Sequence, residues 1–219
     1  LEAGADVGLA FDGDADRVFL VDEQGVGLSG STTTAILADA ILERHPGGVV
    51  VHNLICSKAV AEVVREAGGV PVRTRVGHSF IKQVMAEQDA VFGSEHSAHY
   101  YFADNYRADS GLIAAVMVLE QVCLRGIALS ELRRPYERYS ASGEINPRVS
   151  DTTEVIERVA AAYVGVDQDR LDGLTVDAGS WWFNLRASNT EPLLRLNLEA
   201  ATPEDVARRV DEVLGHFGT

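Results

Sequence analysis

The sequence is poor in cysteine and has no long apolar run. Among its 219 residues the cysteines are Cys56 and Cys123, both in apolar surroundings. Two buried thiols in a reducing compartment are the plainest interpretation of such a pair. No apolar run approaches the roughly 20 residues that a membrane span needs, and no signal-peptide pattern opens the sequence. We therefore expect a cytoplasmic protein with no membrane partner.

Positive charge is also scarce. Lys and Arg number 19 against 33 Asp and Glu, which gives a formal net charge of −14. Nucleic acids and anionic membranes bind basic surfaces, so this balance argues against both as partners. A small anionic substrate stays compatible if a few cations converge locally. The hydrophobic share of 46% and the charged share of 24% are typical of a globular protein.

An initiator methionine is missing as well. The sequence opens with "LEAGADVGLAF", a pattern typical of a helix end that runs into a strand. We expect the chain to be a fragment of a longer protein.

Strand and helix patterns alternate along the first two thirds of the chain, separated by Gly-rich turns. The expected strands are 7–11, 18–21, 49–55, 70–76 and 90–95, and the expected helices are 31–45, 57–69, 80–87 and 110–126. This alternation predicts a three-layer α/β domain with a mixed sheet over residues 26–139. Residues 1–25 are expected to end a preceding α/β domain.

The texture changes after Tyr139. The polar segment Ser140–Ser150 has the composition of a linker, and Asp151 has the pattern of a helix start. Three strand patterns follow, and a last helix begins at Thr202 with Pro203 in its first position. Residues 140–219 are therefore expected to form a small α+β domain.

The stretch "AFDGDADRV" places Asp12, Asp14 and Asp16 at alternate positions before Arg17. A calcium loop of the EF-hand type needs glycine at its sixth position, but Arg17 stands there. An EF-hand loop also lies between two helices, whereas strand patterns flank this one. The sequence therefore argues against an EF-hand. Small residues between the aspartates allow the carboxylates to converge on one Mg²⁺, for which hard oxygen ligands are suited. Arg17 has the forked geometry that binds phosphate. A solvated acidic turn is the alternative.

Two further loops carry polar clusters. "RASNTEPLLR" brings Arg186, Ser188, Asn189 and Thr190 into one turn between strands, where they and the backbone N–H groups suit a phosphate. An ordinary polar hairpin is the alternative.

The second loop is "GSEHSAHYYF". There Glu95, Ser97 and His99 alternate and project to one side if the segment stays extended. A carboxylate and a hydroxyl suit paired sugar hydroxyls, and a histidine such as His99 is a common residue type for proton transfer. A purely structural histidine is the alternative.

Taken in their order along the chain, these three motifs resemble the metal, sugar-binding and phosphate-binding loops of the α-D-phosphohexomutases. "FDGDADR" matches the metal loop, while Asn189 and Ala98 stand where other members carry glycine. "VGHSFIK" resembles a fourth loop and makes His78 a further candidate. The resemblance covers essentially the whole chain, as the end of the second domain followed by the third and the fourth.

The resemblance implies an activity for the intact enzyme. A phosphoserine donates its phosphoryl group to a hexose phosphate, and the bisphosphate sugar then turns around and returns its other phosphate. It further implies Mg²⁺ on Asp12, Asp14 and Asp16, with catalytic roles for Arg17, His78 and His99. Sugar binding falls to Glu95 and Ser97, and phosphate binding to Arg186, Ser188, Asn189 and Thr190.

One expected part is absent from this sequence. The family's serine loop resembles T-A-S-H-N-P, and no such motif occurs here. We therefore expect the N-terminal half of the same enzyme as the missing partner, and no turnover by the chain alone. "EHSAHYYF" followed by "ADSG" looks most like the phosphomannomutases, which act on mannose 1- and 6-phosphate. Phosphoglucomutase, phosphoglucosamine mutase and a non-catalytic sugar-phosphate or metal-binding module stay open.

Overall fold

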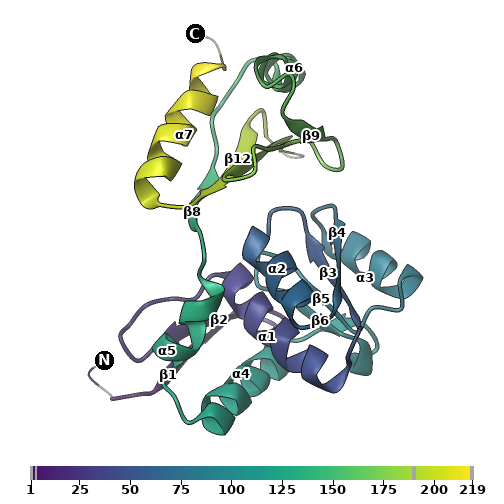
Figure 1. Ribbon diagram of the computed structural model, residues 1–219, viewed down its shortest axis with the longest axis vertical. Coiled ribbons are helices and arrows are strands. Elements are labelled where there is room, and N and C mark those ends of the chain that lie inside the picture. Colours follow the sequence, from purple (N-terminus) through teal and green to yellow (C-terminus); the bar gives the residue numbers. More distant parts are fainter. Residues whose placement is uncertain (1, 3, 189–190, 218–219) are drawn as a thin grey trace. The chain divides into compact units, whose positions relative to one another are not determined.

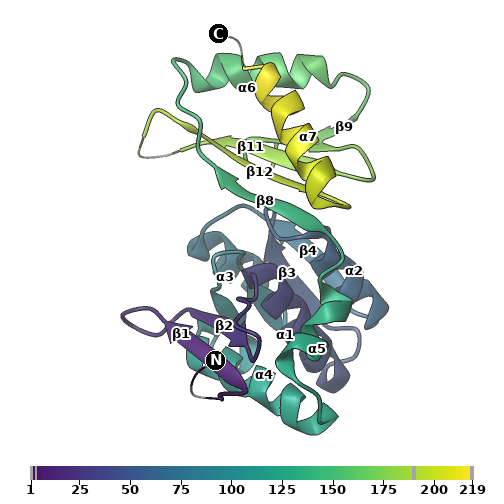
Figure 2. The same ribbon diagram turned by 90° about the vertical axis from the view of Figure 1, so that its left-hand side faces the viewer.

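The computed structural model describes residues 2, 4–188 and 191–217. The chain divides into two compact units, Leu1–Arg138 and Tyr139–Thr219, which are described separately (Figure 1, Figure 2). The separate assignment of residues 1–25 to another domain stays a prediction.

A mixed sheet of strand order β4-β3-β5-β6-β7 forms the centre of the first unit. β3 (Val49–Asn53) runs parallel to β4 (Val70–Thr74) and to β5 (Phe92–Ser94). β6 (Tyr100–Phe102) and β7 (Ala108–Asp109) continue the sheet in antiparallel pairs. The parallel strands are joined by helices and the antiparallel ones by short loops, as these two kinds of pairing require.

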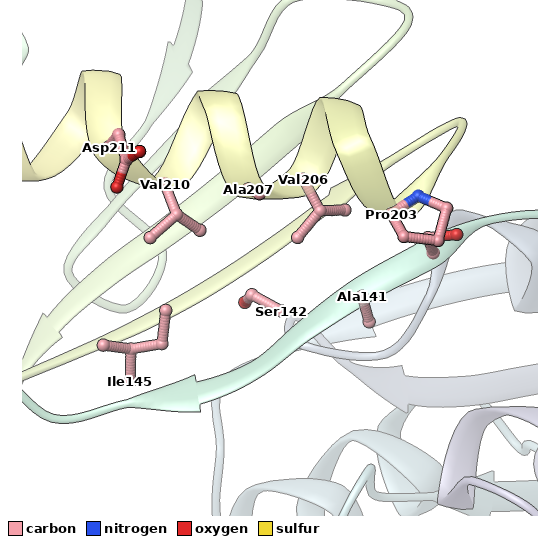
Figure 3. A pocket seen from close by; sticks show the side chains of 9 residues that line it. Ala141, Ser142, Ile145, Pro203, Val206, Ala207, Val210 and Asp211 are labelled. Carbon is pink, nitrogen blue, oxygen red and sulfur yellow. The ribbon is translucent and has the colours of Figure 1, made fainter.

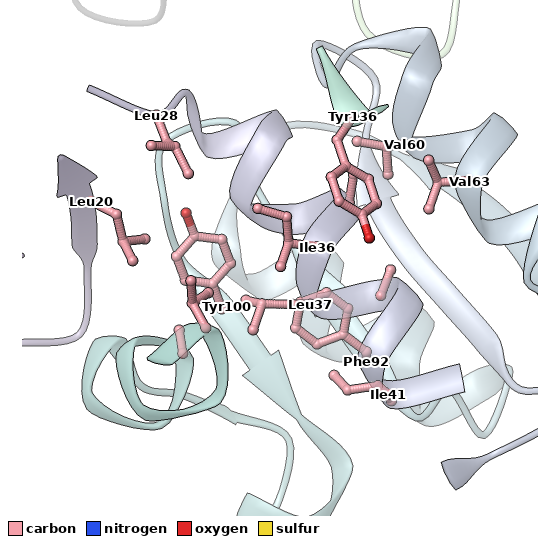
Figure 4. Close-up of a cluster of buried hydrophobic side chains, with 14 of the residues drawn as sticks. Leu20, Leu28, Ile36, Leu37, Ile41, Val60, Val63, Phe92, Tyr100 and Tyr136 are labelled. Atoms are coloured by element: carbon pink, nitrogen blue, oxygen red, sulfur yellow. The ribbon is translucent and has the colours of Figure 1, made fainter. Parts of the chain in front are cut away.

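Helices cover both faces of this sheet. They are α1 (Gly30–Arg44), α2 (Lys58–Glu66), α3 (His78–Glu87), α4 (Gly111–Arg125) and the short α5 (Leu129–Arg133). Successive strand residues point to opposite faces: Val50 lies in a cluster with α1, α2 and α4, and its neighbour Val51 lies in one with α3. Figure 4 shows the larger cluster, with Ile36 and Leu37 of α1 among Leu20, Phe92 and Tyr100. The first unit is thus a three-layer α/β structure, as predicted.

A separate antiparallel pair precedes the sheet. β1 (Val7–Phe11) and β2 (Val18–Asp22) are paired so that Phe11 lies opposite Val18, which closes a loop over residues 12–17. Val18 and Leu20 are fully buried in the same cluster as Ala114 and Ala115 of α4. This packing anchors the strand that follows the aspartate loop to the core of the first unit.

The second unit holds an antiparallel sheet of order β8-β12-β11-β10-β9. Its elements are β8 (Ser140–Ile145), α6 (Thr152–Ala162), β9 (Asp167–Asp169), β10 (Leu174–Asp177), β11 (Trp182–Ala187), β12 (Leu194–Ala200) and α7 (Pro203–Gly215). Phe183 and Leu185 of β11 share a buried cluster with Val159 of α6 and Val206 of α7. The predicted α+β domain is confirmed, with both helices on one face of the sheet.

The expected linker Ser140–Ser150 is wrong over its first half. Residues Ser140–Ile145 form β8, which pairs with β12 through Ile145 opposite Leu196. β8 is an edge strand, and most of its side chains are partly or fully exposed. Edge strands carry polar residues for this reason, so composition alone made the segment resemble a linker.

Among the residues that the structure describes, no single helix is both long and apolar enough to span a membrane. α4 reaches that length and apolarity only together with Leu129–Tyr136, across a bend of 100°.

Candidate active site

The aspartate loop brings its carboxylates together. Asp12, Asp14 and Asp16 each offer an oxygen, and these oxygens all lie within 4.8 Å of one another. The turn is closed by the Ala15 N–H, which donates to the Asp12 carbonyl at 3.3 Å, with Ala15 in the left-handed region at φ 60°. The loop therefore has the convergence that the sequence pattern predicted.

Arg17 lies against this cluster. Its Nε donates to Asp12 Oδ2 at 2.7 Å, and its backbone N–H donates to Asp12 Oδ1 at 3.2 Å. The guanidinium lowers the pKa of Asp12, and the Asp12 carboxylate in turn raises the pKa of Arg17. Arg17, which was expected to bind phosphate, thus binds Asp12 of the aspartate loop in this structure.

Asp16 is the carboxylate best placed for a cation. Its Oδ1 is buried and has no hydrogen-bond partner in the part of the chain that the structure describes. Burial raises the pKa of Asp16, and the neighbouring Asp12 and Asp14 raise it further, while His99 opposes them. An unsatisfied buried oxygen among converging carboxylates fits a hard divalent cation such as Mg²⁺.

The "GSEHSAHYYF" loop, which is predicted to bind sugar and is called the sugar loop from here on, does not stay extended. The Glu95 N–H donates to the His99 carbonyl at 3.0 Å, and the Ala98 N–H donates to the Glu95 carbonyl at 3.1 Å. β5 and β6 are therefore joined by a tight turn whose last residue, Ala98, has φ 69°. Three-residue hairpin loops favour glycine at that left-handed position. This preference explains why glycine is usual at this position in the family that the sequence resembles.

The turn still brings its polar side chains together. Ser97 Oγ lies 3.1 Å from His99 Nδ1, and Glu95 Oε2 lies 3.6 Å from the same nitrogen. Glu95 is 3% exposed. Its Oε1 accepts from the Gly77 N–H at 3.0 Å and its Oε2 from the Tyr101 hydroxyl at 2.8 Å. The carboxylate is thus held by two donors beneath the turn.

His78 is placed next to this arrangement by its neighbour. It is the first residue of α3 and its side chain is exposed, while Gly77 before it binds Glu95. The "VGHSFIK" segment therefore joins the sugar loop through Gly77.

The aspartate loop and the sugar loop meet. Arg17 and His99 form an isolated antiparallel bridge, and His99 Nε2 lies 3.6 Å from Asp16 Oδ1. At the start of α4, the Gly111 N–H donates to the Ala15 carbonyl at 3.2 Å. A Cβ on Gly111 would lie 2.6 Å from the backbone C and O of Arg17, so this close approach requires glycine.

Three residues of this site were not predicted individually. The Tyr101 hydroxyl binds Glu95, and Lys82 Nζ lies 3.0 Å from Asp109 Oδ1. Asp109, Asp16 and His99 also place one ligand atom each within 4.8 Å of one another. The alternation of Glu95, Ser97 and His99 continues to Tyr101, and that signal was available in the sequence. The contact of Lys82 with Asp109 joins residues from α3 and β7, which only the tertiary structure brings together.

The second unit carries its own polar cluster. Arg186 of β11 and Arg195 of β12 lie opposite each other, and both donate to Glu144 of β8, at 3.2 and 3.3 Å. Burial lowers the pKa of Arg186. Both Nε atoms are buried without a partner among the residues that the structure describes. Arg195 and Glu144 were not predicted, although Arg195 lies within the quoted loop.

The rest of the predicted phosphate loop is only partly described. The Ser188 N–H donates to the Leu193 carbonyl at 2.9 Å. Asn189 and Thr190 lie outside the described residues. The phosphate-binding roles in this loop stay predictions.

A pocket of the second unit lies apart from these residues. It has a volume of about 670 Å³ and opens between β8 and α7 (Figure 3). Its walls are mostly small or apolar side chains, among them Ala141, Ile145, Val206, Ala207 and Val210. No predicted site residue lines it.

Two family models match the chain. Residues 29–139 match phosphoglucomutase/phosphomannomutase, alpha/beta/alpha domain III, and residues 144–216 match the C-terminal domain of the same family. The chain therefore belongs to the phosphoglucomutase/phosphomannomutase family, as the resemblance implied.

Individual relatives agree with this assignment. A phosphomannomutase of Salmonella montevideo is 47% identical over 203 residues, covering 91% of this chain and 44% of the relative. That of Methanocaldococcus jannaschii is 42% identical over 208 residues, covering 95% and 46%. The crystal structure of a phosphoglucomutase/phosphomannomutase family protein from Burkholderia thailandensis matches with a TM-score of 0.86 and 29% identity, covering 97% and 46%. This chain spans about half the length of these relatives.

Proposed function

We propose that this chain is the C-terminal part of a phosphomannomutase, which interconverts mannose 6-phosphate and mannose 1-phosphate. The observation that carries the proposal is the meeting of the aspartate loop with the "EHSAH" loop through Arg17 and His99. The relatives named phosphomannomutase, at 40–47% identity, support the choice of sugar. In this reaction a phosphoserine outside the chain gives its phosphoryl group to the sugar. The resulting bisphosphate returns its other phosphoryl group to the serine.

Each described loop has a role in this proposal. Glu95 accepts hydrogen bonds from sugar hydroxyls, and Ser97 donates to them or accepts from them. Both orientations of the bisphosphate present these hydroxyls. His99, which lies 3.1 Å from Ser97 Oγ and 3.6 Å from Asp16, is placed to carry a proton between the sugar loop and the metal loop. His78 is the second candidate for proton transfer. When a cation replaces Arg17 as the partner of Asp12, the Arg17 guanidinium is released to bind the transferring phosphate.

We propose Mg²⁺ as the cation held by Asp12, Asp14 and Asp16. When bound, it neutralises charge on the transferring phosphoryl group, which is the main catalytic requirement of this chemistry. Aspergillus fumigatus N-acetylphosphoglucosamine mutase, which is 14% identical and shares the fold, has been solved with GlcNAc-6P and magnesium.

The second unit holds the phosphate that does not react. Arg186, Ser188, Asn189 and Thr190 were predicted for this role, and Arg195 adds a second guanidinium beside Arg186. Glu144 offsets one of the two positive charges and Asp172 also acts on Arg186, while two buried Nε donors are available for an anion.

The missing partner in this proposal is the N-terminal half, which supplies the phosphoserine, and the chain alone has no mutase turnover. A reducing cytoplasmic location agrees with the free thiols of Cys56 and Cys123. Cys56 is buried as expected, whereas the expectation of a buried thiol is wrong for Cys123, which is exposed. Phosphoglucomutase is the nearest alternative because glucose and mannose phosphates differ only at C2, and no described residue distinguishes that carbon.

A coupled assay of the full-length enzyme tests the substrate. Mannose 1-phosphate and glucose 1-phosphate are compared at equal concentrations with Mg²⁺ present. The proposal expects the higher kcat/KM for mannose 1-phosphate. A clear preference for glucose 1-phosphate makes the enzyme a phosphoglucomutase, and no turnover of either sugar overturns both assignments.

A further inference from the structure

A cluster of buried polar side chains lies directly behind the sugar loop. It contains Ser31 in the first turn of α1, Asn53 at the end of β3, Cys56 and Ser94, which are 3%, 1%, 4% and 0% exposed. Polar groups in a core are costly unless they are hydrogen-bonded. Their contacts therefore show what the cluster does.

Ser31 joins three parts of the first unit. Its Oγ lies 2.9 Å from His96 Nδ1 in the sugar loop, and it accepts from the Ser57 N–H at 3.0 Å. Ser57 is the N-cap of α2. A single buried hydroxyl thus ties the start of α1, the start of α2 and the turn between β5 and β6.

Asn53 holds the same residue by its backbone. Asn53 Oδ1 accepts from the His96 N–H at 3.4 Å and from Cys56 Sγ at 3.2 Å. His96 is therefore contacted through its ring by Ser31 and through its amide by Asn53.

The first residue of α1 closes this contact. A Cβ on Gly30 would collide with the His96 carbonyl oxygen and would lie 3.2 Å from the Ala98 nitrogen. The helix backbone thus lies directly against the turn, with no room for a side chain between them. Ala98, in the left-handed conformation that costs most residues about 1 kcal/mol or more, is 0% exposed at this same contact.

His96 lies between the two proposed sugar-binding residues. It is held on the side of α1 and β3, while Glu95 and Ser97 approach His99. We propose that Ser31 and Asn53 are positioning residues, which fix His96 and thereby hold Glu95 and Ser97 in the geometry that binds the sugar. The identity of the sugar ligand in this inference rests on the proposed function, whereas the conformation of the turn follows from the contacts of His96 alone.

The test separates positioning from general stability. Ser31→Ala removes the hydroxyl that contacts His96, and Ser31→Thr restores one. Thr34→Val is the matched control, because Thr34 is also fully buried in α1 but its hydroxyl donates to Gly30 within the helix, at 2.7 Å.

The first readout needs no ligand. In the 219-residue chain, NMR is expected to show a changed ¹⁵N shift at His96 Nδ1 in Ser31→Ala. Amide exchange at Glu95 and Ser97 is expected to be at least tenfold faster. Ser31→Thr should return both toward the parent, and Thr34→Val should change neither. Equal effects of Ser31→Ala and Thr34→Val on the turn would show a merely structural hydroxyl and overturn the inference.

The second readout uses the full-length enzyme. Ser31→Ala is expected to raise the KM for mannose 1-phosphate at least fivefold while the Mg²⁺ concentration for half-maximal rate stays within twofold. Parallel losses in both quantities contradict a role confined to the sugar loop. If no variant turns over mannose 1-phosphate, the proposed function fails, and the NMR result still decides the inference.

Discussion

Arg17 and His99 lie opposite each other as an antiparallel bridge, although 81 positions separate them in the sequence. Each belongs to a different polar loop, and their backbone pairing brings Asp16 Oδ1 to 3.6 Å from His99 Nε2. One short bridge therefore joins the proposed cation site to the proposed sugar site.

Gly111→Ala should disturb this junction. The added Cβ would lie 2.6 Å from the backbone of Arg17, which cannot move as a flexible side chain does. We expect a loss of about 2 kcal/mol or more in the free energy of unfolding of the first unit. Both tryptophans lie in the second unit, so urea unfolding is best followed by NMR signals of the first.

The matched control for that substitution is Gly27→Ala. A Cβ on Gly27 meets nothing within 4 Å. Stability is expected to change by less than about 0.5 kcal/mol, and an equal loss in both variants would contradict the role of the close approach.

Asp14→Asn should separate cation binding from folding. Asp14 is the exposed member of the aspartate cluster, so its substitution should leave the free energy of unfolding within about 0.5 kcal/mol of the parent. Mg²⁺-dependent turnover of the full-length enzyme is expected to fall at least a hundredfold. Asp104→Asn, at another exposed aspartate, is the control, and near-normal rates in Asp14→Asn would remove the metal assignment.

Glu95→Gln should cost stability as well as activity. Glu95 accepts from two donors, and a glutamine must turn its NH₂ toward one of them. A buried donor left without an acceptor costs about 1–3 kcal/mol. If the Tyr101 hydroxyl is the donor left unpaired, Tyr101→Phe should recover part of that loss. The double-mutant cycle would then show coupling, whereas additivity would show that the glutamine NH₂ faces Gly77. An unchanged stability of Glu95→Gln would contradict the two contacts.

His52 should make the first unit sensitive to acid. Burial lowers the pKa of His52 from 6.5 to about 4. Between these values the unfolded chain binds a proton that the folded chain does not, so stability falls as the pH decreases through this window. From pH 7 to pH 5 the loss due to His52 is expected to be about 2 kcal/mol. Urea unfolding should show a shallower pH dependence in His52→Gln, and an unchanged slope would contradict the buried neutral histidine.

The sequence predicted the parts of this molecule that depend on local patterns. Turn glycines and alternating apolar residues located the helices, the longer strands and the aspartate loop. β8 was missed because an exposed edge strand has the polar composition of a linker. The short strands β6 and β7 were missed because three residues or fewer show no pattern of their own, whereas β5, also of three residues, was predicted as part of the longer segment 90–95.

The candidate site divides in the same way. Asp12, Asp14 and Asp16 are close in sequence, so their convergence was predictable. The turn at Ala98 was not, because only the packing of Gly30 against His96 shows how that conformation is held. Ser31 gave no signal at all, since a serine in a first helical turn is an ordinary residue.

The most direct test compares the full-length enzyme with chain 1–219 in one assay for mannose 6-phosphate formation from mannose 1-phosphate. With Mg²⁺, the full-length enzyme should turn over, and chelation of the metal should abolish that rate. Chain 1–219 should show none, because the phosphoserine that we propose as donor is not part of it. Turnover by chain 1–219 alone, or a full-length rate that is indifferent to chelation, would contradict the account.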